Sequence, residues 1–466
     1  MFTARPFLAA PLCAWLALSP PEAAAQTPDD AAKAPQATQA LEPGARPLEQ
    51  ATGEPLTLER AVGLATDRNE TALAAQKRAE AADARVARAR AFFFPELTVT
   101  GTYTRRMNQS VREVGGEQVV VQQFNALGAN ATARVTLFDA RGFPLYRASR
   151  LEGEAAELDA REARRLVGFE AADAFLTTLG NQQVFGAAQR RLEFARQSLL
   201  DAKARAEAGL ASTNDVTRAE LEVSTAEVQL ASARGSADTS RIELGYLLVS
   251  PVEGALAQPE PLLAEAAGIA GQPAGLGLEQ EAQTRRLDIL SAKLKVEAQQ
   301  AFAREPLARL FPTLGLTGQY RLTNETGLAG RQGDGFLSLD LTWNLFDGGE
   351  RYAERRERVA LAQALDLETT ARTRRVGVDL QRAQVQLSNA QAALRQSELA
   401  AAQARKNAEE TGILYRQGLA TALAVADASL RLFEAEVAMA QARYSLGVAL
   451  LDLRAALGLD PLGKEP

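Results

Sequence analysis

The chain has 466 residues, with 52 Lys and Arg against 58 Asp and Glu and no histidine. The formal charge of −6 argues against a basic nucleic-acid surface. The missing histidine removes the commonest acid–base group at neutral pH and the commonest transition-metal ligand. A single cysteine excludes an internal disulfide and a cysteine zinc site. With 6% aromatic residues, the composition favours long, closely packed helices over a bulky aromatic core.

The first 25 residues have the pattern of a cleaved secretory signal peptide. Arg5 supplies a positive charge, residues 7–18 are mostly apolar, and three alanines at 23–25 suit a cleavage site. The apolar stretch is shorter than the roughly 20 residues that span a bilayer. We expect Cys13 to leave with the signal peptide. Residues 26–55, rich in Ala, Pro and Gln, are expected to form a disordered or extended linker.

Proline divides the rest of the chain. None occurs between Pro144 and Pro251 or between Pro312 and Pro461, and both stretches are full of helix-forming residues. No later segment has the pattern of a transmembrane helix, so any crossing of a membrane has to use β-strands. The predicted organisation is a first structural repeat at 56–250, a connector or equatorial segment at 251–277, a second structural repeat at 278–458 and a C-terminal tail at 459–466.

Three landmarks recur in the same order, each about 210 residues apart, which indicates an internal duplication. The segment Phe-Pro-x-Leu at 94–97 returns at 311–314. Leu-Phe-Asp and Gly-Leu-Ala-Ser/Thr recur in the same way. These two landmarks lie at 137–139 and 209–212 in the first half, and at 345–347 and 418–421 in the second.

Each half also contains segments in which apolar and polar residues alternate. Residues 97–104 alternate with threonine, and residues 337–345 alternate leucine and tryptophan with polar side chains. Strands of about ten residues with one apolar face are typical of outer-membrane barrels, and two soluble hairpins packed on the helices are the alternative. The predicted strand pairs lie at about 96–138 and 313–346, with polar, glycine-containing loops at about 106–119 and 325–335.

The helical stretches carry a seven-residue spacing of apolar residues, as at Leu380, Leu387 and Leu394, which is typical of coiled coils. Each long helix would reach about 100 Å at 1.5 Å per residue. Gly209 and Gly418 at their ends suit tight reversals. The predicted helices lie at about 57–92, 145–208, 212–249, 278–310, 350–417 and 422–457.

On these features the chain resembles the TolC family of outer-membrane efflux proteins. The resemblance covers nearly all of the chain after about residue 56. It implies a mainly α fold with a β-barrel part: a homotrimer in which each chain gives four strands to a 12-stranded barrel, above a helical periplasmic tunnel. The residues that carry it are Phe-Pro-x-Leu at 94–97 and 311–314, Trp343–Gly349, Tyr415–Thr421 and Ala442–Tyr444.

Physical reasoning agrees with a shared barrel. Four strands cannot close a barrel, and open strand edges are not tolerated in lipid, so several chains are needed. Two chains would give eight strands and an interior filled by side chains, whereas three chains would give twelve strands and leave a lumen.

The resemblance further implies that the helix tips dock a periplasmic adaptor. Glycine permits each turn, leucine offers an apolar contact, and Ser or Thr caps the returning helix. A plain helix turn without docking is the alternative. The implied tip residues are Arg205, Gly209, Leu210, Ser212, Arg416, Gly418, Leu419 and Thr421.

The resemblance also implies a gate, because in that family an inner coiled coil closes the tunnel with polar links and aspartate rings. Asp427 falls on one ring position, and Tyr415 and Asp215 match a pair that links neighbouring coils. Three copies of Asp427 around an axis would favour cations. The chain departs from the family at Ala424, where a second ring is expected, and at Ala420, where the prototype has a basic residue. A solvated helix-face carboxylate is the alternative for Asp427.

We therefore expect a passive outer-membrane exit duct of a tripartite efflux or type I secretion system. The expected partners are two further copies, an adaptor, an inner-membrane RND or ABC pump, and outer-membrane lipid. We expect no catalysis, cofactor, metal site or nucleic-acid binding, since the chain has no GxxxxGK[ST] loop or other catalytic motif. The alternative is a periplasmic coiled-coil scaffold or adaptor without a pore, which would need an inner-membrane anchor and a lipoyl-like domain.

Overall fold

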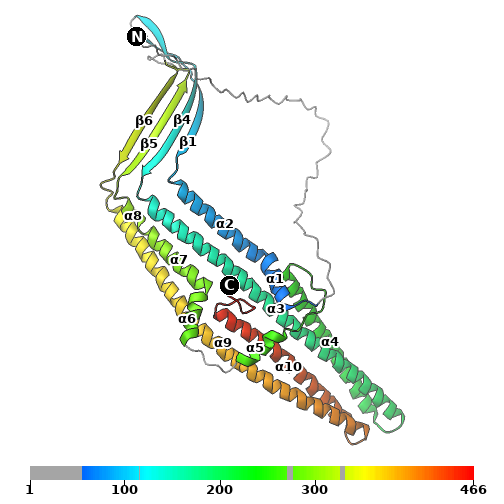
Figure 1. The fold of residues 1–466 in the computed structure, drawn as a ribbon. Helices are drawn as coiled ribbons and strands as arrows, with labels where there is room; N and C mark the ends of the chain where they lie inside the picture. The colour runs from blue at the N-terminus through cyan, green and yellow to red at the C-terminus, as the bar shows by residue number, and fades with distance from the viewer. Residues whose placement is uncertain (1–54, 115, 270–275, 326–330, 466) are drawn as a thin grey trace, which may run out of the picture. The chain divides into compact units, whose positions relative to one another are not determined.

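The computed structural model describes residues 55–114, 116–269, 276–325 and 331–465. The predicted signal peptide and almost all of the predicted linker lie outside the described residues. Residues 53–466 form one unit of the chain, and the following description concerns that unit (Figure 1).

Helices make up most of this unit, and two long helical hairpins dominate it. The helix α3 packs against α2, α4, α7 and α10, and α9 packs against α10 and α7. The first hairpin consists of α3 (Gly142–Glu207) and α4 (Thr213–Leu248), and the second of α9 (Glu350–Arg416) and α10 (Ala422–Ala456). The shorter helices are α1 (Leu58–Arg68), α2 (Glu70–Ala91), α5 (Glu260–Ile269), α6 (Leu276–Arg285), α7 (Leu287–Phe302) and α8 (Glu305–Ala308).

Local sequence explains where these helices begin. Thr57 accepts a hydrogen bond from the backbone of Arg60 at the start of α1, and Asn69 accepts one from Thr71 where α1 gives way to α2. Side-chain caps of this kind satisfy backbone N–H groups that have no partner within the helix. The structure describes no helix that combines the length and the apolar character needed to cross a membrane.

Four antiparallel strands form a sheet in the order β1-β4-β5-β6. The register aligns apolar and small residues across the sheet, as in the row Leu97, Ala133, Gly318 and Leu337. Rows with polar residues alternate with these, so the sheet has one apolar and one mostly polar face. The strands are β1 (Glu96–Arg105), β4 (Asn125–Phe138), β5 (Thr313–Thr323) and β6 (Gly333–Thr342).

The strands join the helices at the ends of α3 and α9 that lie far from the hairpin turns. β4 leads into α3 and β6 leads into α9, while β1 follows α2 and β5 follows α8. The combination of a mainly helical chain with antiparallel strands is confirmed.

Two segments differ from the sequence-based expectation. The expected loop at 106–119 contains most of a separate hairpin of β2 (Ser110–Val114) and β3 (Glu117–Gln122). The expected connector at 251–277 contains α5, which forms because Leu262, Leu263 and Ala266 are buried against the long hairpins.

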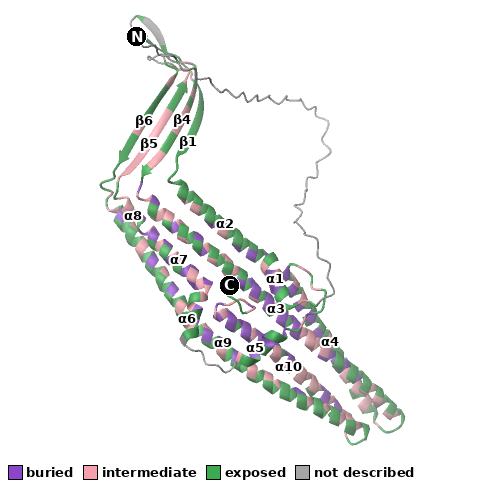
Figure 2. Ribbon diagram, in the orientation of Figure 1, coloured by how far each residue is buried: buried purple, intermediate pink, exposed green. Residues whose placement is uncertain are grey.

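The main core lies midway along α3 (Figure 2). Phe175, Leu176 and Leu179 of α3 are almost completely buried against Leu244 of α4 and Leu450 of α10. Each such side chain contributes on the order of 2 kcal/mol through its removal from water. This core fixes the two hairpins against each other, and their turns extend beyond it.

Candidate functional site at the helix tips

Glycine makes both hairpin turns possible. Gly209 has φ 70° and Gly418 has φ 78°, a left-handed conformation that other residues adopt only with strain. In each turn the following leucine returns a hydrogen bond of 2.8 Å to the preceding helix, from Leu210 to Arg205 and from Leu419 to Leu414. Both leucine side chains are strongly exposed, at 80% and 73%. The tips thus present an apolar side chain on a tightly fixed turn.

The residue that starts each returning helix is a cap. Ser212 accepts a hydrogen bond from the backbone of Asp215, and the Asp215 carboxylate accepts one from the Ser212 backbone, which completes a capping box. Thr421 accepts a hydrogen bond of 3.3 Å from the backbone of Ala424. Asp215 is therefore engaged within its own turn.

Arg205 joins the two tips. Its guanidinium lies 4.3 Å from the centre of the Tyr415 ring and donates a hydrogen bond of 3.0 Å to the backbone carbonyl of Arg416. Among the described residues, no hydrogen bond joins Tyr415 to Asp215, the two residues that the sequence grouped as a link. Within one chain, Arg205 connects the first hairpin to Tyr415 through this cation–π contact.

Asp427 lies on an exposed face of α10, and its carboxylate accepts a hydrogen bond of 2.9 Å from Arg431 one turn later. This pairing raises the pKa of the Arg431 guanidinium. Ala424 is exposed and Ala420 is half-buried, and neither methyl side chain adds a charge nearby. The sequence analysis missed Arg431, although the spacing of four residues on a helix would have indicated the pair.

Glu436 is a second site that the sequence analysis missed. From α10 it accepts hydrogen bonds from Arg190 of α3 at 2.8 Å and from Arg405 of α9 at 3.0 Å, and we call this arrangement the Glu436 clamp. Burial by itself raises the pKa of Glu436, but the two arginines outweigh that effect and hold the pKa below its usual value. One carboxylate thus connects three helices of the two hairpins.

Arg191 adds a buried contact beside this clamp. It pairs with Glu222 of α4 at 2.6 Å, and its guanidinium lies 5.2 Å from the centre of the Phe433 ring of α10. Because Arg191 is buried, these contacts offset the cost of removing its charge from water.

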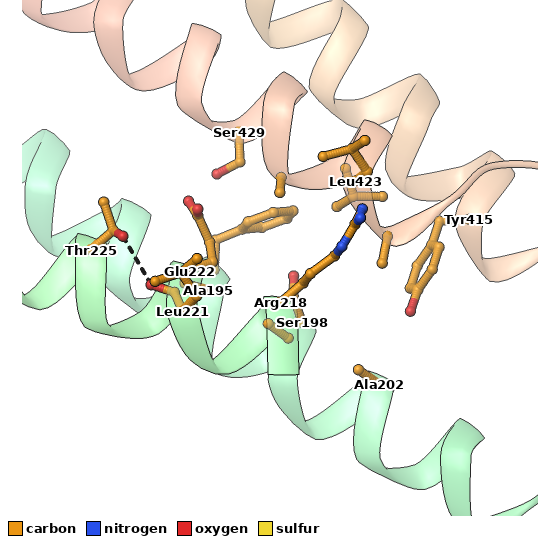
Figure 3. Close-up of a pocket in the computed structure, with 15 residues that line it drawn as sticks. Ala195, Ser198, Ala202, Arg218, Leu221, Glu222, Thr225, Tyr415, Leu423 and Ser429 are labelled. Carbon is orange, nitrogen blue, oxygen red and sulfur yellow. Dashed lines mark hydrogen bonds between the residues drawn. The ribbon is translucent and has the colours of Figure 1, made fainter. Parts of the chain in front are cut away.

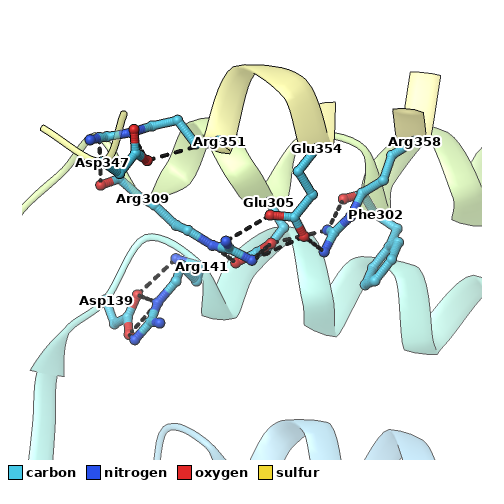
Figure 4. Close-up of polar contacts among 9 residues, drawn as sticks. All are labelled: Asp139, Arg141, Phe302, Glu305, Arg309, Asp347, Arg351, Glu354 and Arg358. Carbon is cyan, nitrogen blue, oxygen red and sulfur yellow. Dashed lines mark hydrogen bonds and ion pairs between the residues drawn. The ribbon is translucent and has the colours of Figure 1, made fainter. Parts of the chain in front are cut away.

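A further charged cluster lies where the strands meet the helices (Figure 4). Glu305 is 4% exposed and accepts hydrogen bonds from Arg309 at 2.8 Å and from Arg358 at 3.0 Å. Glu354 contacts the same two arginines. Nearby, the pairs Asp139–Arg141 and Asp347–Arg351 fix the first turns of α3 and α9. We call these eight residues the junction cluster.

Long helical hairpins with glycine turns, together with a four-stranded antiparallel sheet that has one apolar face, are features of outer-membrane channels. The model of the family described as outer membrane efflux protein matches residues 61–248 and 278–459. The chain belongs to this family and is an outer-membrane protein. Nothing in the matches favours the alternative of a periplasmic adaptor.

Individual relatives agree with this assignment. The toluene efflux pump outer membrane protein TtgC of Pseudomonas putida is 26% identical over 56% of this chain. The match spans 53% of TtgC, about half of its length. The pyoverdine export outer membrane protein OpmQ of Pseudomonas aeruginosa is 25% identical over 83% of this chain and 81% of its own.

Among solved structures, the outer membrane protein VceC of Vibrio cholerae has a TM-score of 0.71 at 17% identity. The match covers 86% of this chain and 96% of VceC. At this level of identity the likeness concerns the fold.

Proposed function

We propose that three copies of the chain form the exit duct of a tripartite efflux system, with a shared 12-stranded barrel. The main support for this proposal is that the four-stranded sheet has two open edges. Its edge strands β1 and β6 have no further strand partner among the described residues. Three successive antiparallel pairings make β1 and β6 run in opposite directions, so β6 of one copy can pair antiparallel with β1 of the next.

Two requirements set the proposed number of chains: the barrel has to close, and it has to enclose an open passage. Unpaired N–H and C=O groups at an edge cannot be left in lipid, so the ring of sheets has to close. Two copies would give an interior filled by side chains, whereas three give a passage. The exposed apolar residues of β1 and β6, such as Val99 and Leu339, suit contact with lipid.

We also interpret the two helical hairpins, with tips at Gly209 and Gly418, as the products of an internal duplication.

For partners, we propose a periplasmic adaptor and an inner-membrane pump. The exposed Leu210 and Leu419, held on rigid turns that Arg205 joins, would dock the adaptor. The relatives are named for toluene efflux and pyoverdine export, which favours small molecules as substrates over polypeptides. The duct would conduct passively and perform no chemistry.

We also propose that Asp427, Tyr415 and Asp215 contribute to the closed end of the tunnel. Three copies of Asp427 near one axis would favour cations. Because Arg431 neutralises part of each charge, this selectivity would be moderate. Tyr415 and Asp215 would then link neighbouring hairpins, with Arg205 holding the Tyr415 ring in place.

The test is to isolate the mature protein from the outer-membrane fraction, to measure its mass by native mass spectrometry, and to record ion currents in planar bilayers. A mass of three chains and stepwise currents are the expected results. A monodisperse monomer that stays in solution without detergent would overturn both the barrel and the duct.

A further inference from the structure

A cavity of about 310 Å³ lies between the two hairpins close to their tips, and we call it the tip pocket (Figure 3). Its walls are mainly apolar and come from α3, α4, α9 and α10, with Phe194, Leu221, Leu423 and Val425 among the lining residues. Tyr415 also lines it. The volume falls at the lower end of the range of small-molecule sites, about 300–1,000 Å³.

One exposed cation, Arg218 of α4, lines this apolar space. Figure 3 shows the Arg218 side chain reaching from α4 toward Leu423 of α10. In the described part of the chain, Arg218 has neither an ion pair nor a hydrogen-bond partner. Glu222 is the other charged residue that lines the pocket, and its carboxylate is already paired with Arg191 at 2.6 Å. The charge of Arg218 is therefore available to a ligand.

The hydroxyl groups of the pocket offer a second polar contact. Thr225 already donates its hydroxyl hydrogen to the carbonyl of Leu221 at 2.9 Å. Ser429 of α10 is 7% exposed, lines the pocket, and finds no hydrogen-bond partner among the described residues. Its oxygen is not one of the buried side-chain atoms that lack a partner, so it is accessible from the pocket and can hydrogen-bond a polar group of a ligand.

From these contacts we infer that the tip pocket binds a small amphiphile that carries one carboxylate on an apolar body. The guanidinium of Arg218 would hold the carboxylate through charge-assisted hydrogen bonds, and the apolar walls would hold the body. The pocket lies within one chain, so the inference does not depend on the proposed trimer.

Binding would couple to the arrangement of the hairpins. Residues of α3 and α4 form one side of the pocket, and residues of α9 and α10 form the other. A ligand that contacts both sides stabilises the arrangement in which the pocket exists, by a free energy that rises with the ratio of free ligand concentration to Kd. Such a ligand would oppose any movement of one tip away from the other.

The experiment uses the full mature protein in lipid nanodiscs, because detergent would compete for the pocket. The probe is 1-naphthaleneacetate, titrated by calorimetry against the protein and against empty nanodiscs. The neutral 1-naphthaleneacetamide has the same body without the charge. We expect the carboxylate to bind about tenfold more tightly than the amide or better, since its hydrogen bonds to Arg218 are charge-assisted.

Three variants test the assignment. Arg218→Gln should remove the preference for the carboxylate, and Ala219→Phe should weaken both probes because it fills the pocket. Arg234→Gln, on the same helix but outside the pocket, should bind like the wild type. Bound naphthaleneacetate should also slow amide exchange at both tips. Equal affinity for the two probes, or carboxylate binding unchanged by both Arg218→Gln and Ala219→Phe, would overturn the inference.

Discussion

Glu305 holds the junction cluster together, so its replacement is a sensitive probe of the link between strands and helices. Its carboxylate accepts hydrogen bonds from Arg309 and Arg358, and it is 4% exposed. Removing one partner of a buried ion pair costs about 3–5 kcal/mol. Two features reduce this figure, because Glu354 still contacts both arginines and Arg309 is partly exposed to water. For Glu305→Gln we expect a loss of about 2–3 kcal/mol of local stability.

Hydrogen–deuterium exchange of α8 and the start of α9 measures this loss directly. A change of about 2–3 kcal/mol corresponds to about a 30- to 150-fold increase in the local opening equilibrium. Glu357→Gln is the control, since Glu357 lies near the start of α9, within the segment whose exchange is measured, but is exposed. Exchange in Glu305→Gln that equals exchange in the control would refute the reasoning that this buried carboxylate stabilises the junction.

Further predictions concern the tips. Gly418→Val should lower the stability of the turn by about 1–2 kcal/mol through left-handed strain alone, since a side chain there meets open space. Tip amides should then exchange faster, and efflux should fall while trimers still form. The control Gly412→Val, within helix α9, should leave the turn intact. For Glu436, a lowered folded-state pKa means that the stability of the clamp is complete above the ordinary pKa of a glutamate and is lost as the pH falls through the lowered value. The local opening equilibrium near the clamp, taken from amide exchange after correction for the intrinsic exchange rate at each pH, should rise with acid in the wild type. Identical pH profiles of that equilibrium for the wild type and Glu436→Gln would contradict this. In planar bilayers Asp427→Ala should reduce cation selectivity because it removes the negative charge of the pair, and Arg431→Gln should increase it because it removes the positive charge. If neither variant changes the selectivity, Asp427 does not face the pore.

Residue patterns that repeat along the chain were the most predictable part of this molecule. The heptad spacing and the glycines at 209 and 418 predicted the long hairpins and their turns, because local sequence determines helices and left-handed positions. The alternation of residues predicted β1 and β6. In contrast, α5 was missed because its flanking prolines and glycines dominate the pattern, whereas its formation depends on burial of Leu262 and Leu263 by distant helices.

At the helix tips and the Glu436 clamp, local features were again predictable from the sequence and contacts between distant helices were not. Turn glycines and capping residues could be found because their roles are local. The Glu436 clamp could not, since its partners Arg190 and Arg405 lie on other helices and are brought near by packing alone. For the same reason the sequence could not show that Arg205, and not Asp215, contacts Tyr415 within one chain.

Disulfide cross-linking between β1 and β6 tests the shared barrel most directly. Cys13, in the predicted signal peptide, is the chain's only cysteine, so new pairs can be introduced without interference. Val99→Cys would be combined in turn with Leu337→Cys, Leu339→Cys and Leu341→Cys. Within one chain these strands are separated by β4 and β5, about 14 Å across three strand spacings, which is too far for a disulfide. The proposal predicts that one of these pairs gives covalent dimers and trimers on oxidation, with no species above three chains. Monomers alone in all three pairs, or a ladder that continues beyond three chains, would contradict it.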